Sequence, residues 1–171
     1  MAQAVERIAE LATDGFGHYV VTPNADHIVT VEKDALFQKI YREADLVLCD
    51  SQILKWLARF NRAHIREKVS GSDLFQPVCK MAQDKGLTVF LFGSTDDVHA
   101  KASERLKACY PGLKIAGCYA PPYGFEKDAV AVQKAVAAIS ATAPDILCLF
   151  LGAPKQEKFF YENRAALRAH V

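Results

Sequence analysis

Short apolar runs recur along the chain, separated by segments in which apolar residues have a helical spacing. The most apolar run covers residues 145–151, and comparable runs cover residues 18–21, 45–49, 88–92 and 114–118. Short runs rich in Val, Leu, Ile and Phe, without regular polar alternation, are typical of strands buried on both faces. The pattern therefore predicts five strands.

The segments between these runs have apolar residues at intervals of three and four. The predicted helices cover residues 3–12, 27–42, 71–85, about 95–109, 126–142 and 155–167, with one more that contains residues 53–60. We expect Ile53, Leu57 and Phe60 to face the core from that last helix. Val98 and Cys109 are expected to do so from theirs. Strands that alternate with helices predict right-handed βαβ units and a parallel sheet covered on both faces.

A Gly-Ala-Pro-Lys-Gln-Glu sequence follows the last apolar run. Gly152 turns the chain, and Pro154 suits the first turn of a helix. Lys155, Gln156 and Glu157 then lie at a helix N-terminus beyond the carboxyl end of a buried strand. Open α/β sheets bind ligands at that edge, and the free amides and dipole of the helix favour anions there. The alternative is a turn that only caps the helix.

Composition limits the class of protein. The chain has the length of one domain, taken here as residues 1–171, and its 51% hydrophobic content is enough for a sizeable core. The net charge of +1, with acids and bases interspersed, gives no electrostatic reason to expect nucleic acid as a partner. No run approaches the roughly 18 apolar residues of a membrane span, and the N-terminus lacks the features of a signal peptide.

Five cysteines are scattered along the chain, and none forms a CxxC pair. Cys49 and Cys148 fall inside apolar runs, where Cys behaves as a small buried hydrophobe. This usage predicts a reduced, cytoplasmic chain rather than a disulfide framework.

Familiar nucleotide and metal motifs are absent. No G-x-x-x-x-G-K-[ST] occurs and no G-x-G-x-x-G follows a strand, so the common ATP and NAD motifs are not supported. His27 and His64 are isolated, and no cysteine cluster suggests a metal. Ser51 and Ser94 lack the G-x-S-x-G elbow of a hydrolase. The sequence therefore predicts neither a metal nor a cofactor.

Candidate site residues follow the end of each predicted strand. In strand order they are Thr22 and Asn24, Asp50, Gly93 and Ser94, Tyr123 and Phe125, and Gln156 and Glu157. Because the carboxyl ends of parallel strands share one edge, we expect these residues to converge. The alternative for each is a helix cap, which is the role expected of Asp73, Ser94 and Thr95.

Three of these residues suit transfer chemistry on a sugar. Asp50 comes directly after an apolar run, where burial disfavours the charged carboxylate and would suit a general base. Thr22 and Asn24 offer neutral donors and acceptors of the kind that sugar hydroxyls require.

A basic run follows the helix that contains residues 53–60. It consists of Arg59, Arg62, His64, Arg66 and Lys68. Such a run is most often a solvated face. Its functional interpretation is attraction to phosphates or to an anionic membrane surface.

Six stretches, taken together and in order, make the chain similar to a known family. They are residues 22–25, 44–50, 69–74, 90–93, 110–115 and 152–158. On these motifs the sequence resembles the bacterial WecG/TagA/CpsF glycosyltransferase family over nearly its whole length.

The resemblance implies a fold and a reaction. The fold would be a Rossmann-like parallel β-sheet with helices on both faces, in a GT-E-like arrangement. The reaction would be inverting and metal-independent, moving an N-acetylmannosamine-type sugar, a uronic acid or a hexose from a UDP-sugar donor. The acceptor would be a polyprenyl-diphosphate-linked sugar in teichoic acid or exopolysaccharide synthesis. The protein would then be cytoplasmic and peripheral at the inner face of the plasma membrane.

The resemblance also implies roles for single residues. Asp50 would be the catalytic base, with Thr22, Asn24 and Gln156 positioning donor sugar or acceptor. The Gly93 turn and the loop at Tyr123, Gly124 and Phe125 would belong to the nucleotide pocket. The rest of the expected substrate-binding set is Ser51, Ser94, Gly152, Lys155 and Glu157.

The chain departs from the family pattern in three places. The family has Asp-Gly where this chain has Asp50-Ser51, and the loop at residues 120–125 is longer than the family's Gly-Tyr-Phe. The glycine-rich strand and basic appendage that follow the last motif in the family are missing, so we expect a core domain truncated at the C-terminus. An open sheet edge there favours a homo-oligomer. The alternatives are a catalytically inactive nucleotide-sugar-binding remnant of the family and, less favoured, an unrelated Rossmann-like dinucleotide-binding protein.

Overall fold

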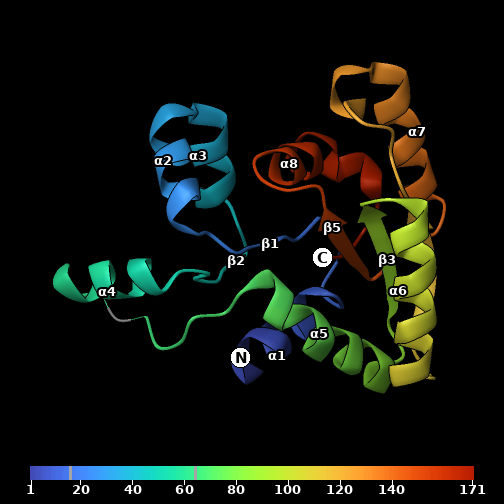
Figure 1. The fold of residues 1–171 in the computed structure, drawn as a ribbon, viewed down its shortest axis with the longest axis horizontal. Coiled ribbons are helices and arrows are strands. Elements are labelled where there is room, and N and C mark those ends of the chain that lie inside the picture. Colours follow the sequence, from blue (N-terminus) through green and yellow to red (C-terminus); the bar gives the residue numbers. More distant parts are fainter. Residues whose placement is uncertain (16, 64) are drawn as a thin grey trace.

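The computed structural model describes residues 1–15, 17–63 and 65–171 (Figure 1). The strands are β1 (Val20–Val21), β2 (Leu46–Val47), β3 (Thr88–Gly93), β4 (Lys114–Tyr119) and β5 (Ile146–Phe150). The helices are α1 (Ala2–Leu11), α2 (Ala25–Lys33), α3 (Ala35–Arg42), α4 (Gln52–Phe60), α5 (Gly71–Lys85), α6 (Asp96–Cys109), the 3-10 helix η1 (Phe125–Lys127), α7 (Ala129–Ser140) and α8 (Lys155–Leu167). The α/β class with parallel strands flanked by helices is confirmed. The prediction for His64, in the basic run, lies outside the described residues.

The strands form two hydrogen-bonded sheets rather than one. β3 is the centre of a three-stranded parallel sheet in the order β4-β3-β5. β1 and β2 pair in parallel as a separate two-stranded sheet. The central strand β3 has neighbours on both sides, which is why it is the most completely buried strand.

The C-terminal residues lie between the two sheets. The Val171 N–H donates to Asp145 O at 3.2 Å and the Leu147 N–H donates to Val171 O at 2.7 Å, which is the pattern of a parallel pair with β5. On the other side, the His18 N–H donates to the carbonyl of residue 170 at 3.0 Å. Figure 1 shows this terminus between β1 and β5. The residues after α8 therefore run between the two sheets rather than along an outer edge.

Alternate residues of β3 face two separate halves of the core. Val89 and Leu91 pack in a cluster with residues of α1 and α5, whereas Phe90 and Phe92 pack with residues of α7 and α8. The Phe92 ring stacks on that of Phe159 with centroids 4.9 Å apart. Helices on both faces explain why the strand is apolar at every position from Val89 to Phe92.

Two predicted helices are each divided. The helix expected at residues 27–42 is α2 and α3, separated at Asp34, whose φ of −125° and ψ of 103° are not helical. The Asp34 carboxylate accepts from the Phe37 N–H at 3.0 Å and so begins a new helix. The helix expected at residues 126–142 is η1 followed by α7, which Asp128 caps in the same way. Asp in both cases offers the backbone an alternative to a continuous helix.

The prediction that the apolar face of α4 points into the core was wrong. Ile53, Leu57 and Phe60 are 57%, 51% and 85% exposed, and α4 has no buried residue. On α6, likewise, Val98 and Cys109 are exposed, and the buried positions are His99 and Leu106. Periodicity identifies a helix with an apolar face, but it does not say which part of the chain covers that face.

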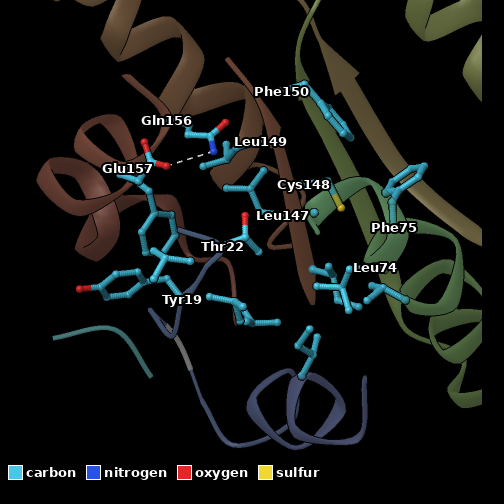
Figure 2. Close-up of a pocket in the computed structure, with 18 of the residues that line it drawn as sticks. Tyr19, Thr22, Leu74, Phe75, Leu147, Cys148, Leu149, Phe150, Gln156 and Glu157 are labelled. Carbon is cyan, nitrogen blue, oxygen red and sulfur yellow. Dashed lines mark hydrogen bonds between the residues drawn. The ribbon is translucent and has the colours of Figure 1, made fainter. Parts of the chain in front are cut away.

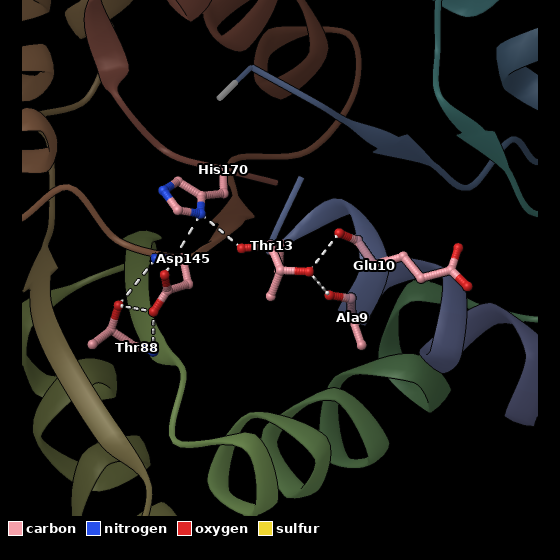
Figure 3. Close-up of polar contacts among 7 residues, drawn as sticks. Ala9, Glu10, Thr13, Thr88, Asp145 and His170 are labelled. Carbon is pink, nitrogen blue, oxygen red and sulfur yellow. Dashed lines mark hydrogen bonds and ion pairs between the residues drawn. The ribbon is translucent and has the colours of Figure 1, made fainter. Parts of the chain in front are cut away.

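A polar cluster fixes the amino ends of β3 and β5 (Figure 3). The Thr88 N–H and hydroxyl both donate to Asp145 Oδ2 at 2.7 Å, and the Asp145 N–H donates to Thr88 Oγ1 at 3.0 Å. His170 Nδ1 lies 2.7 Å from Ala12 O and 3.6 Å from Asp145 Oδ1. The cluster thus joins the two strands to the C-terminal residues and to the end of α1.

We expect Thr88→Val to destabilise the protein by about 1–3 kcal/mol, because it leaves the Asp145 N–H without its acceptor and removes a donor from the carboxylate. Urea unfolding would measure the change. Thr30→Val is the matched control, since that hydroxyl only donates to Asp26 O within α2. The control should cost less than about 0.5 kcal/mol. Equal losses in the two variants would contradict the role given to this cluster.

A second polar contact joins α8 to the α2–α3 pair. The Lys158 ammonium donates to the Asp34 carboxylate, which also caps α3. The hydrogen bond from Lys158 and the one from the Phe37 N–H hold the pKa of Asp34 below its ordinary value. The folded state therefore releases this proton more readily than the unfolded chain. The resulting stabilisation is complete above the unfolded pKa of about 4 and is lost as pH falls through the lower folded value.

Replacing Lys158 should therefore make the free energy of unfolding less dependent on pH in the acid range. We expect Lys158→Met to lower the urea midpoint at pH 7, and the difference from the parent to shrink as pH falls below about 4. Lys107→Met, on the exposed side of α6, is the control and should leave the profile unchanged. A difference that stays constant with pH would show that Lys158 acts through packing alone.

Candidate functional site

A cavity of about 610 Å³ lies between β1 and β5 (Figure 2). Residues 169–171 pair between the two sheets at the amino ends of these strands, and Val171 lines the cavity. Its apolar wall comes from β5 and from α5. The residues of α5 in this wall are Leu74, Phe75 and Val78. The polar groups come from the ends of β1, α5 and α8, so the cavity is at the carboxyl edge of the strands, where ligands bind in such folds.

The start of α5 meets the end of β1 at this cavity. Gly71 and Ser72 line it together with Thr22. A Cβ added at Gly71 would lie 3.5 Å from Thr22 Oγ1, so the hydroxyl is directly beside the first turn of the helix. Ser70 is the cap of α5, with its Oγ accepting from the Asp73 N–H at 3.1 Å. The prediction that Asp73 caps this helix was wrong, since Ser70 satisfies that amide.

The start of α8 forms the opposite polar wall. Gly152 has a left-handed φ of 76°, and Gln156 Oε1 accepts from its N–H at 3.2 Å. Gln156 Nε2 then donates to Glu157 Oε1 at 3.2 Å, as Figure 2 shows. The side chain of Gln156 therefore links the turn at Gly152 to the first turn of α8. Gln156 and Glu157 both line the cavity.

Glu157 is a buried acid, and one of its carboxylate oxygens accepts no hydrogen bond from the described residues. It is 8% exposed, and its Oε2 atom has no hydrogen-bond partner within the described part of the chain. Burial, with the nearby Glu157 charge, raises the pKa of the Tyr41 phenol. A buried carboxylate oxygen without a donor is costly, so this atom suits a ligand hydroxyl.

Asp50 is at the same edge of the fold, beside the neighbouring strand. Its N–H donates to Pro23 O at 2.9 Å, which places it next to the loop that contains Thr22. Lys68 Nζ lies 3.8 Å from Asp50 Oδ1, and the Asp50 side chain is 29% exposed. The burial that we expected of Asp50 is therefore only partial. Thr22, Gln156 and Glu157 line the cavity together, whereas Asp50 stands one loop away from it.

Two predicted site residues act as helix caps. Asn24 Oδ1 accepts from the Asp26 and His27 N–H groups at 3.0 and 3.2 Å. Ser51 Oγ accepts from the Leu54 N–H at 3.2 Å. These oxygens serve α2 and α4, and contact with a substrate through their remaining hydrogen-bonding capacity stays a prediction.

The turn after β3 depends on glycine. Gly93 has a φ of 106°, and a Cβ there would lie 2.6 Å from Phe150 O. Ser94 also has a left-handed φ, of 59°, and the cap of α6 is Thr95, whose Oγ1 accepts from the Val98 N–H at 3.4 Å. Thr95 thus caps as predicted, and Ser94 does not.

The loop after β4 has one exposed and one buried aromatic ring. Tyr123 is fully exposed, and Lys155 Nζ lies 5.3 Å from its ring centroid. Lys155 also lies 3.1 Å from Glu126 Oε1. Gly124 has a left-handed φ of 77° and begins η1. Phe125 is 4% exposed and packs in the core, so its ring is not available to a nucleotide.

Residues 71 and 72 are the part of the cavity that sequence reasoning missed. We expected Gly71-Ser72 only to open a helix. The available signal was the small residues at a helix start within one of the six family-like stretches, and small residues there let a ligand approach the free amides.

Two further findings concern the described residues alone. Across residues 1–15, 17–63 and 65–171, no group of three or more His, Cys, Asp or Glu side chains is placed to hold a metal ion. Within the same ranges, no helix is long and apolar enough to cross a bilayer.

Comparisons with known proteins identify relatives of this chain. It is 30% identical over 149 residues to an N-acetylglucosaminyldiphosphoundecaprenol N-acetyl-beta-D-mannosaminyltransferase of Bacillus spizizenii, covering 86% of this chain and 55% of the relative. It is 27% identical over 148 residues to the protein of that name from Bacillus subtilis, covering 86% of this chain and 56% of the relative. The chain thus spans about half the length of the curated relatives it matches. The Glycosyl transferase WecG/TagA/CpsF family matches residues 1–171, and the chain belongs to that family.

Proposed function

We propose that this chain is the core of an inverting glycosyltransferase that moves an N-acetylmannosamine-type sugar from UDP to a polyprenyl-diphosphate-linked N-acetylglucosamine. Membership of the family over residues 1–171 supports the reaction class. The names of the Bacillus relatives support the donor sugar and the acceptor. The proposal extends to a protein that works at the cytoplasmic face of the membrane without a metal or cofactor.

The observation on which the proposal depends is the meeting of two helix N-termini at one cavity. Gly71 and Ser72 of α5 approach from one side and Gln156 and Glu157 of α8 from the other. Free amides and helix dipoles at such ends favour anions. A nucleoside diphosphate is an anion that would gain from both, and the apolar wall of α5 and β5 would accept the flat face of a base or sugar.

The polar side chains of the cavity suit a sugar. Thr22 Oγ1 can donate and accept, and Glu157 Oε2 is a buried acceptor that lacks a donor among the described residues. A sugar hydroxyl that donates to Glu157 would satisfy this oxygen. Gln156 holds the neighbouring Oε1 atom and so fixes the direction of the carboxylate.

Asp50 is the proposed general base. It would remove the proton of the acceptor hydroxyl as that oxygen attacks the anomeric carbon, while the bond from this carbon to the UDP oxygen breaks on the opposite side. A single displacement of this kind inverts the anomeric centre. Lys68, 3.8 Å from Asp50, keeps a positive charge near the reacting groups. The first amides of α5 would stabilise the charge on the departing diphosphate, whereas the Lys155 and Gln156 N–H groups of α8 already donate to Gly152 O.

We expect Asp50→Asn to lower the rate of transfer by roughly 10²–10⁴-fold while changing UDP-sugar affinity only a few-fold, since the amide keeps the shape and removes the base. The assay would follow transfer from UDP-N-acetylmannosamine to a lipid-linked N-acetylglucosamine acceptor, with donor binding measured by calorimetry. Asp96→Asn is the control, because Asp96 is exposed in the first turn of α6.

The outcomes separate the functions under consideration. Near-normal transfer by Asp50→Asn would show that the base is another residue. Binding of UDP-sugars without transfer by the parent chain would favour the inactive remnant. Binding of NAD in preference to UDP-sugars would overturn the assignment altogether.

A further inference from the structure

The exposed face of α4 is a feature of the molecule that the proposed site does not use. Ile53, Trp56, Leu57 and Phe60 follow the spacing i, i+3, i+4, i+7, so they form one stripe along the helix. All four are more than half exposed, and Phe60 is 85% exposed. We call these four side chains the α4 stripe. Figure 1 shows α4 at the periphery of the molecule, beyond β2.

The opposite side of α4 attaches it to the rest of the protein. Leu54 and Ala58 line a second apolar groove together with Ile28 of α2 and Leu48 after β2. Lys55 Nζ donates to Arg66 O at 2.9 Å, which joins the helix to the segment that returns towards α5. Leu57 also borders this groove, and the α4 stripe points outwards mainly through Ile53, Trp56 and Phe60.

Positive charge is concentrated in the segment that contains the α4 stripe. Between residues 52 and 68 the sequence has five Lys or Arg residues and one acid, although the whole chain has a net charge of only +1. Arg59 and Arg62 are exposed at the end of the helix. The single acid, Glu67, is in contact with the N-terminal ammonium of Met1. An apolar stripe with a cationic margin fits a surface that is apolar inside and anionic outside.

We propose that the α4 stripe docks on an anionic lipid surface, with Trp56 and Phe60 in the boundary between headgroups and acyl chains and Arg59 and Arg62 on the phosphates. Amphipathic helices with aromatic residues on one side and cations beside them bind bilayers in this way. A second copy of the chain is the less suitable occupant, because a two-fold contact through this face would place its cations against one another. The inference rests on the proposed function in one respect, namely that the protein works at a membrane.

The sequence supplies its own probe for this surface. Trp56 is the only tryptophan in the chain, so intrinsic tryptophan fluorescence reports on α4 alone. We expect vesicles of phosphatidylcholine mixed with phosphatidylglycerol to shift the emission to shorter wavelength and protect it from an aqueous quencher. Vesicles of phosphatidylcholine alone should have a weaker effect. Added salt should reduce the difference between the two, because it screens exposed charges.

Matched variants separate the contributions of apolar and of charged side chains to vesicle binding. Phe60→Ser should weaken partitioning into the mixed vesicles by about tenfold or more, the effect of exposing one large apolar side chain. Arg59→Gln and Arg62→Gln should each weaken it about fivefold, and only with anionic vesicles. Val130→Ser, which removes an exposed apolar side chain from α7, and Lys107→Gln, which removes an exposed cation from α6, should have no effect. Circular dichroism would establish that every variant is folded.

Three results would overturn the proposal. The first is emission that does not respond to either kind of vesicle, and the second is an equal response to both that salt does not change. The third is a shift that appears with protein concentration in the absence of lipid, together with a dimer in sedimentation, which would assign the face to a second copy.

A separate transfer assay with a short-chain, water-soluble acceptor distinguishes this proposal from the proposed function. Transfer without vesicle binding would defeat the lipid surface alone. Vesicle binding without transfer or UDP-sugar binding would defeat the proposed function and leave the lipid surface intact.

Discussion

The backbone pairing of residues 169–171 is the constraint on which the arrangement of the two sheets depends. These residues pair with β5 on one side and with the segment before β1 on the other, at the amino ends of the strands. The side chains of Asp145 and His170 hold the same corner. The cavity lies between β1 and β5, is lined along both strands and by Val171, and brings Thr22 and Gln156 together.

At the carboxyl edge of the strands, the same residues cap helices and are candidates for ligand binding. Asn24 and Ser51 use their side-chain oxygens to satisfy the first amides of α2 and α4. Gln156 closes the turn before α8 while lining the cavity. A short polar residue after a strand can cap the next helix and also face a ligand, since both roles need an oxygen at the carboxyl edge of the sheet. The sequence pattern of a cap and that of a binding residue are therefore the same here, and only contacts can separate them.

The two proposals place the proposed catalytic base next to the helix that would contact the lipid surface. Ser51 caps α4 directly after Asp50, so the proposed base is at one end of the helix whose exposed face would meet the bilayer. An acceptor whose reactive sugar is joined to a lipid through a diphosphate has to present that sugar close to the membrane surface. A base held at the N-terminus of a surface helix is well placed for such an acceptor, and the cations around the α4 stripe would favour its diphosphate.

The sequence by itself determined the elements with strong periodicity and the residues at strand ends. Helices α1, α5 and α8 and strands β3 and β5 follow from apolar spacing, because burial on both faces leaves an uninterrupted apolar run and burial on one face leaves a helical repeat. β4 also follows from its apolar run, although it lies at an edge of its sheet and none of its residues is fully buried. Only the tertiary structure decided which apolar faces are covered, since that depends on long-range packing. The stripe of α4 has the same pattern as a core helix and yet is exposed. The division of the sheet, the entry of Gly71 and Ser72 into the cavity and the burial of Glu157 likewise depend on contacts between segments far apart in the chain, which no local pattern encodes.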